Sequence, residues 1–253
     1  MAITNKKLVA VVETSGRIGS VAIGNEDSIL YESTFSGFMK HSAELFDALS
    51  VLLSKVGAHP EQIGQLYITA GPGSFTGIRI AVTLAKMLSY AMDTRVVAVN
   101  TLDAAAENAS AYIQQTGDTL QRVAPILDAK QNRFFTAVYR RDGDDWTKEH
   151  PESLLYPDQL LSLIKDSAAP VGLLGEGLVY YAEKFTSPMT RLLDETYWPV
   201  TAGGVYAAGR KMAQRGQFCD INTLVPTYIR KPDAVEKRER QNTASSDRPQ
   251  EPS

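Results

Sequence analysis

The chain has 253 residues, 43% of them hydrophobic, with a formal net charge of -3 and an isoelectric point near 5.7. This length allows one large or two small domains, and the acidic balance excludes a domain that binds nucleic acid through overall charge alone. A single cysteine, Cys219, excludes disulfides within the chain and favours a reducing, cytoplasmic compartment. The first apolar run, Leu8–Val12, is too short for a signal peptide or a membrane helix.

The first predicted elements are three strands, Leu8–Val12, Gly19–Gly24 and Ser28–Phe35. Short turns join them, so we expect an antiparallel meander. A helix is predicted over His41–Val56, because six apolar side chains share an arc of about 120° when each residue turns by about 100°. These side chains are Leu45, Phe46, Leu49, Leu52, Leu53 and Val56.

Residues 69–80 read Thr-Ala-Gly-Pro-Gly-Ser-Phe-Thr-Gly-Ile-Arg-Ile. They lie between a predicted strand, Gln65–Thr69, and a predicted helix, Phe75–Met92. A Gly-rich turn before a helix can bind an anion through free backbone N–H groups, or it can let two backbones approach closely. The pattern alone leaves both functions open.

The predicted helix Phe75–Met92 is apolar around nearly its whole circumference. Four of its polar side chains fall within about 60° of arc: Arg79, Thr83, Lys86 and Tyr90. Such a helix must be covered on several sides. The helix His41–Val56 can cover one side, and the rest requires either a layer from residues 101–115 or another protein chain.

The remaining predicted elements alternate between strands and helices, and no internal repeat is visible. They are strands at Arg95–Asn100, Val123–Leu127, Phe134–Arg140 and Val171–Gly175, and helices at Leu102–Gln115, Pro157–Lys165 and Val205–Gln214. Residues 231–253 combine charges and prolines with almost no apolar side chains, so we predict a disordered tail.

Several segments together resemble the TsaB (YeaZ) family. The most specific is residues 71–79, Gly-Pro-Gly-Ser-Phe-Thr-Gly-Ile-Arg. Others are Val12–Ser15 with Ser20–Ile23, the pair His41-Ser42, and Asp128-Ala129 ahead of Phe134–Tyr139. Pro226–Arg230 is similar to the closing segment of the family. The resemblance spans residues 8 to about 230 and is weakest between 141 and 220.

The resemblance implies an α/β protein with the actin-like ATPase (sugar kinase) fold, which has two lobes, each with a mixed sheet and flanking helices. The expected divisions are an N-terminal lobe at 1–100, a smaller C-terminal lobe at 101–230 and the tail at 231–253. The implied function is a non-catalytic scaffold that binds the TsaD-type threonylcarbamoyltransferase. It would support formation of threonylcarbamoyladenosine beside the anticodon of tRNAs that read codons starting with A.

The resemblance also implies partners and sites. A TsaE-type ATPase joins the complex, ATP and a metal belong to the partner subunits, tRNA is contacted indirectly, and a homodimer can form when TsaD is absent. The expected partner-binding residues are His41, Leu45, Leu49, Leu52, Leu53, Phe75, Ile78, Arg79, Val82 and Lys86. The expected vestigial nucleotide site comprises Glu13, Thr14, Ser15, Gly71, Gly73, Ser74 and Asp128.

A metal site and a peptidase are not expected. None of the three histidines, His41, His59 and His150, is three or four residues from another, so no helical ligand pair exists. The catalytic paralogues carry a His-x-x-x-His pair, whereas here Leu45 follows His41 at that spacing. Gly73–Gly77 also differs by one residue from the Gly-x-Ser-x-Gly elbow of hydrolases.

The alternative function is a nucleotide-binding transferase or kinase of the actin-like superfamily. Many family members have Asp where this chain has Glu13, and the catalytic paralogues tend to have Glu-Thr-Ser there. Two acids, Glu13 and Asp128, together with a Gly-rich turn are the minimum for binding a nucleotide with its metal. The sequence leaves this alternative open.

Overall fold

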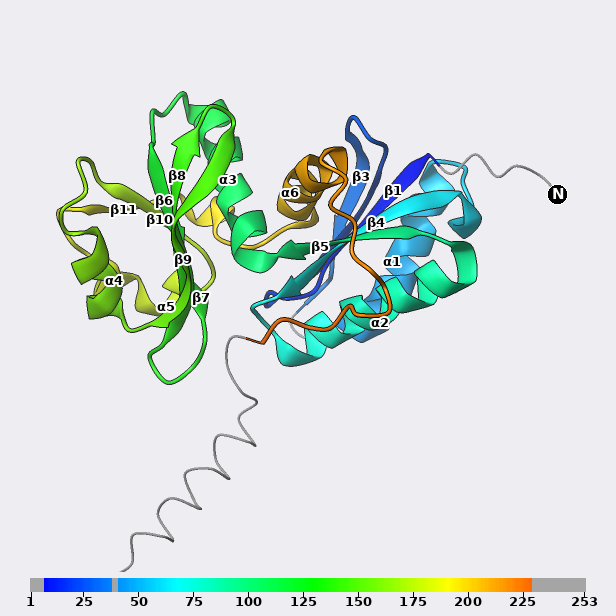
Figure 1. Cartoon of the computed structure of the whole chain (residues 1–253), viewed down its shortest axis with the longest axis horizontal. Helices are drawn as coiled ribbons and strands as arrows, with labels where there is room; N and C mark the ends of the chain where they lie inside the picture. The colour runs from blue at the N-terminus through cyan, green and yellow to red at the C-terminus, as the bar shows by residue number, and fades with distance from the viewer. Residues whose placement is uncertain (1–6, 38–40, 229–253) are drawn as a thin grey trace, which may run out of the picture.

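The computed structural model describes residues 7–37 and 41–228, with only the backbone at His41 and Ser42. Figure 1 shows two lobes, each built on a mixed β-sheet with helices packed on it. This arrangement confirms the predicted actin-like α/β fold. Within the described ranges, every helix is too short or too polar to span a bilayer.

Sheet 1 carries the first lobe, with strand order β3-β2-β1-β4-β5. The first three strands form the predicted antiparallel meander, and the last two run parallel to β1. Side chains of β1 alternate between two hydrophobic clusters, so both faces of the sheet are buried. The strands are β1 (Leu8–Glu13), β2 (Ser20–Gly24), β3 (Ile29–Thr34), β4 (Ile63–Gly71) and β5 (Arg95–Asn100).

Three helices cover sheet 1. On one face lie α1 (His41–Lys55) and α2 (Phe75–Met92), whose bounds match the predictions within one residue. On the other face lies α6 (Ala202–Gln214), which comes from the far end of the chain. A short 3-10 helix, η1 (Pro60–Gln62), precedes β4.

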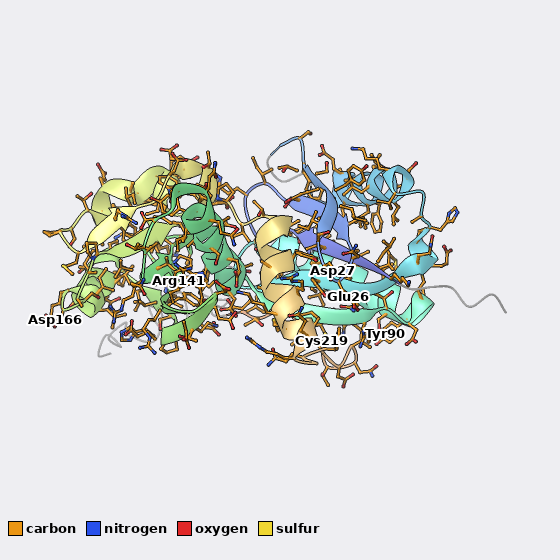
Figure 2. The ribbon with its side chains drawn as sticks, turned by 90° about the horizontal axis from the view of Figure 1, so that it is seen from above. Glu26, Asp27, Tyr90, Arg141, Asp166 and Cys219 are labelled. Carbon is orange, nitrogen blue, oxygen red and sulfur yellow. The ribbon has the colours of Figure 1, made fainter. Side chains whose placement is uncertain are left out.

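Residues 219–228 supply part of the additional cover that α2 requires. Leu224 packs into the same cluster as α1 and α2, and the Cys219 N–H donates to the Val96 carbonyl at 2.9 Å. The Tyr90 hydroxyl of α2 donates to Asn222 at 3.2 Å, and Figure 2 shows Tyr90 and Cys219 near the same end of the lobe. The expected layer from residues 101–115 lies elsewhere, since α3 (Thr101–Thr116) packs against α6 and sheet 2.

Sheet 2 carries the second lobe and repeats the topology of sheet 1. Strand β8 pairs antiparallel with β6, β7 and β9, while β10 runs parallel to β6, and β11 runs parallel to β10. The strands are β6 (Arg122–Pro125), β7 (Leu127–Asp128), β8 (Phe134–Asp142), β9 (Asp145–Leu155), β10 (Val171–Leu174) and β11 (Thr190–Leu192). The remaining helices are α4 (Pro157–Ile164), α5 (Leu178–Tyr181), η2 (Ala182–Phe185) and η3 (Glu195–Tyr197).

Some elements differ from the sequence predictions. The strand expected at Val123–Leu127 is divided into β6 and β7, and α6 begins three residues before Val205. Strands β9 and β11 and helix α5 were not predicted. The proposed tail at 231–253 lies outside the described residues. The boundary between 1–100 and 101–230 stays a prediction, although α6 and residues 219–228 lie on sheet 1.

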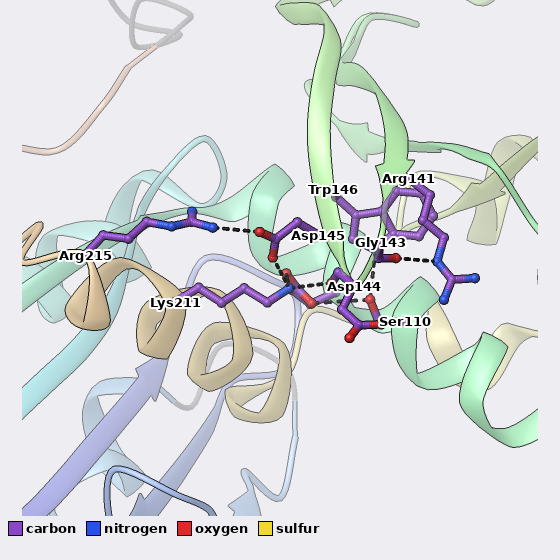
Figure 3. A network of polar contacts seen from close by, with 9 residues as sticks. Ser110, Arg141, Gly143, Asp144, Asp145, Trp146, Lys211 and Arg215 are labelled. Carbon is purple, nitrogen blue, oxygen red and sulfur yellow. Dashed lines mark hydrogen bonds and ion pairs between the residues drawn. The ribbon is translucent and has the colours of Figure 1, made fainter.

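A network of charges joins the lobes through α6 (Figure 3). The Lys211 ammonium lies 2.8 Å from Glu107 of α3 and 3.0 Å from Asp145 at the start of β9. Arg215 lies 2.6 Å from the same Asp145. Burial raises the pKa of Glu107, and the hydrogen bond from Lys211 partly offsets that effect. Lys211 therefore stabilises a carboxylate that would otherwise be buried without an opposing charge.

We expect Lys211→Met to lower the free energy of unfolding by about 3 kcal/mol at pH 7, because it leaves Glu107 uncompensated. The loss of the ammonium raises the pKa of Glu107 further, so the effect should shrink as the pH falls to about 5 and the carboxyl takes a proton. Urea denaturation at both pH values measures this. Arg191→Met, which breaks the more exposed pair with Asp118, should cost less than about 1 kcal/mol; equal losses would contradict the account.

Candidate functional site

The Gly-rich turn between β4 and α2 packs directly on the turn after β1. The Ser74 N–H donates to the Ser15 carbonyl at 2.8 Å, and the Thr14 hydroxyl donates to the Gly77 carbonyl at 2.7 Å. A Cβ on Gly73 would lie 2.6 Å from the Ser15 carbonyl oxygen. A Cβ on Gly77 would lie 1.7 Å from the Thr14 carbonyl oxygen. These glycines allow two backbones to touch.

The same turn also contacts the last described residues of the chain. Gly71 has a φ of +122°, and a Cβ there would lie 2.3 Å from the Thr227 carbonyl oxygen. The Thr227 N–H donates to the Ala70 carbonyl at 2.8 Å. Gly71 therefore provides both an unusual backbone angle and room for the C-terminal segment.

Two backbone donors at the N-terminus of α2 have protein acceptors. The Ser74 side chain caps the helix by accepting from the Gly77 N–H at 3.2 Å, and the Ser74 N–H is used by Ser15. Of the two functions that a Gly-rich turn allows, this geometry favours close packing over phosphate binding.

Glu13 is fully buried at the end of β1. Its Oε1 accepts from the Ser15 N–H at 2.6 Å and from the Ser15 hydroxyl at 2.5 Å, with a longer contact of 3.3 Å from the Thr69 hydroxyl. Burial raises the pKa of Glu13 from 4.5 to about 7, although the bonds from Ser15 oppose the rise. Burial therefore disfavours a negative charge on Glu13 that no donor or cation compensates.

Glu176 of the second lobe faces Glu13 across Gly16. Oxygens of both carboxyl groups lie within 3.4 Å of the position that a Gly16 Cβ would occupy. Glu176 accepts from the Arg17 N–H at 2.8 Å, and burial raises its pKa. The Arg17 guanidinium donates to the Tyr180 hydroxyl at 2.7 Å and lies 4.8 Å from the centre of that ring. The two lobes are thus in direct contact over the end of β1.

Sequence reasoning expected Asp128 as the second acid and missed Glu176. The Asp128 carboxylate accepts from the Lys130 N–H at 2.7 Å and pairs with its ammonium at 2.9 Å. The available signal was an acid between two glycines, Gly175 and Gly177, directly after a buried strand. In the described parts of the chain, no group of three or more His, Cys, Asp or Glu side chains is placed to hold a metal ion.

The outer sides of α1 and α2 expose large apolar side chains. Phe46 is 55% exposed and Val51 54% exposed on α1, and Met87 is 46% exposed on α2. Tyr90 is also exposed on α2. Both helices rest on the same face of sheet 1. We call these four residues the helix-pair surface.

Most of the predicted partner-binding residues lie beneath this surface. The side chains that pack into the core between the helices and sheet 1 are Leu45, Leu49, Leu52, Leu53, Ile78 and Val82. Phe75 and Arg79 are exposed, and Lys86 is partly exposed. The side chain of His41 lies outside the described residues. A docked protein would therefore meet the helix-pair surface and these exposed neighbours rather than the buried leucines.

Phe75 anchors the start of α2 against the C-terminal segment. Its ring stacks on Tyr228 with centroids 5.0 Å apart, and the Arg79 guanidinium lies 4.9 Å from the centre of the Phe75 ring. The closing segment and the Gly-rich turn, which are far apart in sequence, therefore form one structural unit.

We expect Gly77→Ala to destabilise the protein by about 3 kcal/mol, because the added methyl group would overlap the Thr14 carbonyl and force the two turns apart. Thermal denaturation followed by circular dichroism measures the loss. Gly203→Ala is the matched control, since the nearest atom to its Cβ lies 3.4 Å away. Similar losses of stability in the two variants would show that the close contact at Gly77 does not hold the two turns together.

Comparisons with known proteins agree with the fold. Residues 37–194 match the family described as TsaD, tRNA N6-adenosine threonylcarbamoyltransferase. The chain is 25% identical to the Bacillus subtilis protein "tRNA threonylcarbamoyladenosine biosynthesis protein TsaB", over 90% of this chain and 96% of the relative. It is 27% identical to the Escherichia coli protein with the same description, over 88% and 94% of the two chains. The structure of YeaZ from Pseudomonas aeruginosa superposes with a TM-score of 0.76 at 23% identity, covering 88% of this chain and all of that one.

Proposed function

We propose that this chain, which belongs to the TsaD family and within it to the TsaB (YeaZ) group, serves the biosynthesis of threonylcarbamoyladenosine in tRNA. Its part is that of a non-catalytic scaffold that binds a TsaD-type threonylcarbamoyltransferase in the cytoplasm. The modified adenosine lies beside the anticodon of tRNAs that read codons starting with A.

The helix-pair surface is the observation that carries this proposal. Phe46, Val51, Met87 and Tyr90 are exposed, although each could bury a large area against another protein. The outer sides of two helices that lie side by side also provide ridges and grooves into which the helices of a paralogue with the same fold can pack. The expected contact is a helix bundle across the interface.

The geometry around Glu13 supports a role without catalysis. The Ser74 and Gly77 N–H groups of the Gly-rich turn have protein acceptors, and Glu13 accepts from Ser15 and faces Glu176. In the alternative, a nucleotide-binding transferase or kinase, these groups would be free for phosphates and a metal. ATP and a metal are accordingly assigned to the partner subunits. Calorimetry with ATP and Mg²⁺ would favour the alternative if it gave saturable heat.

The other proposed partners are those that the family resemblance implies. A TsaE-type ATPase would join the pair, and tRNA would be bound mainly by the partners, in keeping with the net charge of -3 of this chain. In the absence of the TsaD-type protein, the helix-pair surface would bind a second copy of itself, because a patch shared by both subunits suits a two-fold dimer.

Size-exclusion chromatography with light scattering tests the proposal. The protein, the TsaD-type paralogue of the same organism and their mixture are each run at the same concentrations. The proposal predicts that the mixture elutes as a complex with the mass of one copy of each. Separate elution of the two proteins at micromolar concentrations would contradict it.

A further inference from the structure

A cavity lies at the end of sheet 1 opposite Glu13, and the proposed scaffold role does not use it. Its volume is about 310 Å³. Gln65 and Arg95 line it from the beginnings of β4 and β5, and Glu26 lines it from the turn between β2 and β3. Arg210 of α6 and Phe218 complete the wall. Figure 2 shows Glu26 beside α6.

The floor of the cavity is a chain of buried hydrogen bonds. The Tyr67 hydroxyl donates to the Gln65 side-chain oxygen at 2.7 Å, and the Gln65 amide donates to Glu26 Oε1 at 2.9 Å. Tyr67 and Gln65 are both buried, whereas Glu26 is exposed at the rim. These hydrogen bonds fix the position of the Glu26 carboxylate. Its second oxygen remains able to accept a hydrogen bond from a ligand.

The opposite charge in the cavity comes from Arg95 and Arg210. The Arg95 guanidinium lies 4.1 Å from the centre of the Phe218 ring and has no hydrogen-bond or ion-pair partner within residues 7–37 and 41–228. Arg210 donates to the Asp27 carbonyl at 2.9 Å. A guanidinium carries five N–H donors, so most donors of both arginines are available to a carboxylate.

We propose that this cavity binds a small zwitterion of the α-amino-acid type. The ligand carboxylate accepts from Arg95 and Arg210, its ammonium donates to Glu26, and its side chain lies along Phe218. The charges of the wall, two arginines against Glu26 and Asp27, balance each other and select a ligand that carries both signs. The volume is at the small end of the range for ligand pockets, about 300–1,000 Å³, which suits a single amino acid.

Isothermal titration calorimetry on the full chain tests this proposal. The probes are glycine, L-threonine and L-phenylalanine, with propionate and ethylamine as ligands that carry one charge only, and inorganic phosphate. At least one amino acid should bind with a dissociation constant of about 1 mM or tighter. Propionate and ethylamine should each bind at least about tenfold more weakly, since each loses one set of charge-assisted hydrogen bonds.

Two variants remove opposite ends of the site. Glu26→Gln and Arg95→Met should each weaken the binding of the amino acid by about tenfold, and Arg141→Met in the second lobe is the matched control. Circular dichroism establishes that each variant is folded. Absence of binding by all three amino acids would overturn the proposal. Equally tight binding of propionate or phosphate would indicate a simple anion site and would also overturn the proposal. Unchanged affinity for the amino acid in both folded variants would overturn it as well.

Discussion

Phe46→Asp and Met87→Asp are each expected to weaken the complex with the TsaD-type partner by about 30-fold or more. Each substitution places a charge where the proposed complex buries an apolar side chain at the centre of its interface. Such central side chains typically contribute at least about 2 kcal/mol to the free energy of binding. Because Phe46 and Met87 are about half exposed in the isolated chain, its own free energy of unfolding should change by less than about 0.5 kcal/mol. Surface plasmon resonance measures the affinity, and urea denaturation measures the stability.

Leu163→Asp provides the matched control for these variants. Leu163 is also exposed and apolar, but it lies on α4 in the second lobe. Its replacement should leave the affinity unchanged within about twofold. An equal loss in Leu163→Asp would mean that added negative charge, rather than the helix-pair surface, weakens the complex. Full affinity in both α1 and α2 variants would exclude this surface as the contact.

Glu13→Gln is expected to stabilise the protein at pH 8 by up to about 3 kcal/mol and to change little at pH 5. The folded-state pKa of Glu13, about 7, lies above the usual 4.5, so ionisation of the carboxyl costs stability progressively as the pH rises between these values. A pKa difference of this size corresponds to about 3 kcal/mol in the free energy of unfolding. Glutamine carries no charge at either pH, and its oxygen can still accept from Ser15.

Urea denaturation between pH 5 and pH 8 measures the effect of Glu13→Gln. Glu61→Gln, at an exposed position in η1, should change the stability by less than about 0.5 kcal/mol at both pH values. A Glu13→Gln protein that is less stable than the unsubstituted chain at pH 8 would contradict the account. It would mean that the Glu13 carboxylate is needed in its charged form, as it is when it holds a cation.

The first lobe could be predicted from the sequence because its signals are local. The apolar stripe of α1, the Gly-rich turn before α2 and the short turns between the first strands are all encoded by neighbouring residues. Periodicity reports which side of a helix packs, but it does not say against what. The contact residues expected from the resemblance include Leu45, Leu49 and Ile78, which pack on their own sheet, and omit Met87 of the exposed side.

The rest of the fold depends on contacts between distant residues. Strand β9 is largely polar and contains no fully buried residue, and its pairing with β8 defines it. The Glu13–Glu176 contact joins two lobes across the chain, and residues 219–228 return to cover α2. The repeat of the sheet topology is likewise invisible in the sequence, because side chains diverge while the strand order stays the same.

The measurement that tests the central claim most directly is threonylcarbamoyl transfer to tRNA by the reconstituted TsaD-type and TsaE-type partners. The double variant Phe46→Asp, Met87→Asp and the single variant Glu13→Gln are each compared with the unsubstituted chain. A scaffold that acts through the helix-pair surface predicts loss of transfer with the double variant and full transfer with Glu13→Gln. Full transfer with the double variant, or loss of transfer with a folded Glu13→Gln protein, would contradict it.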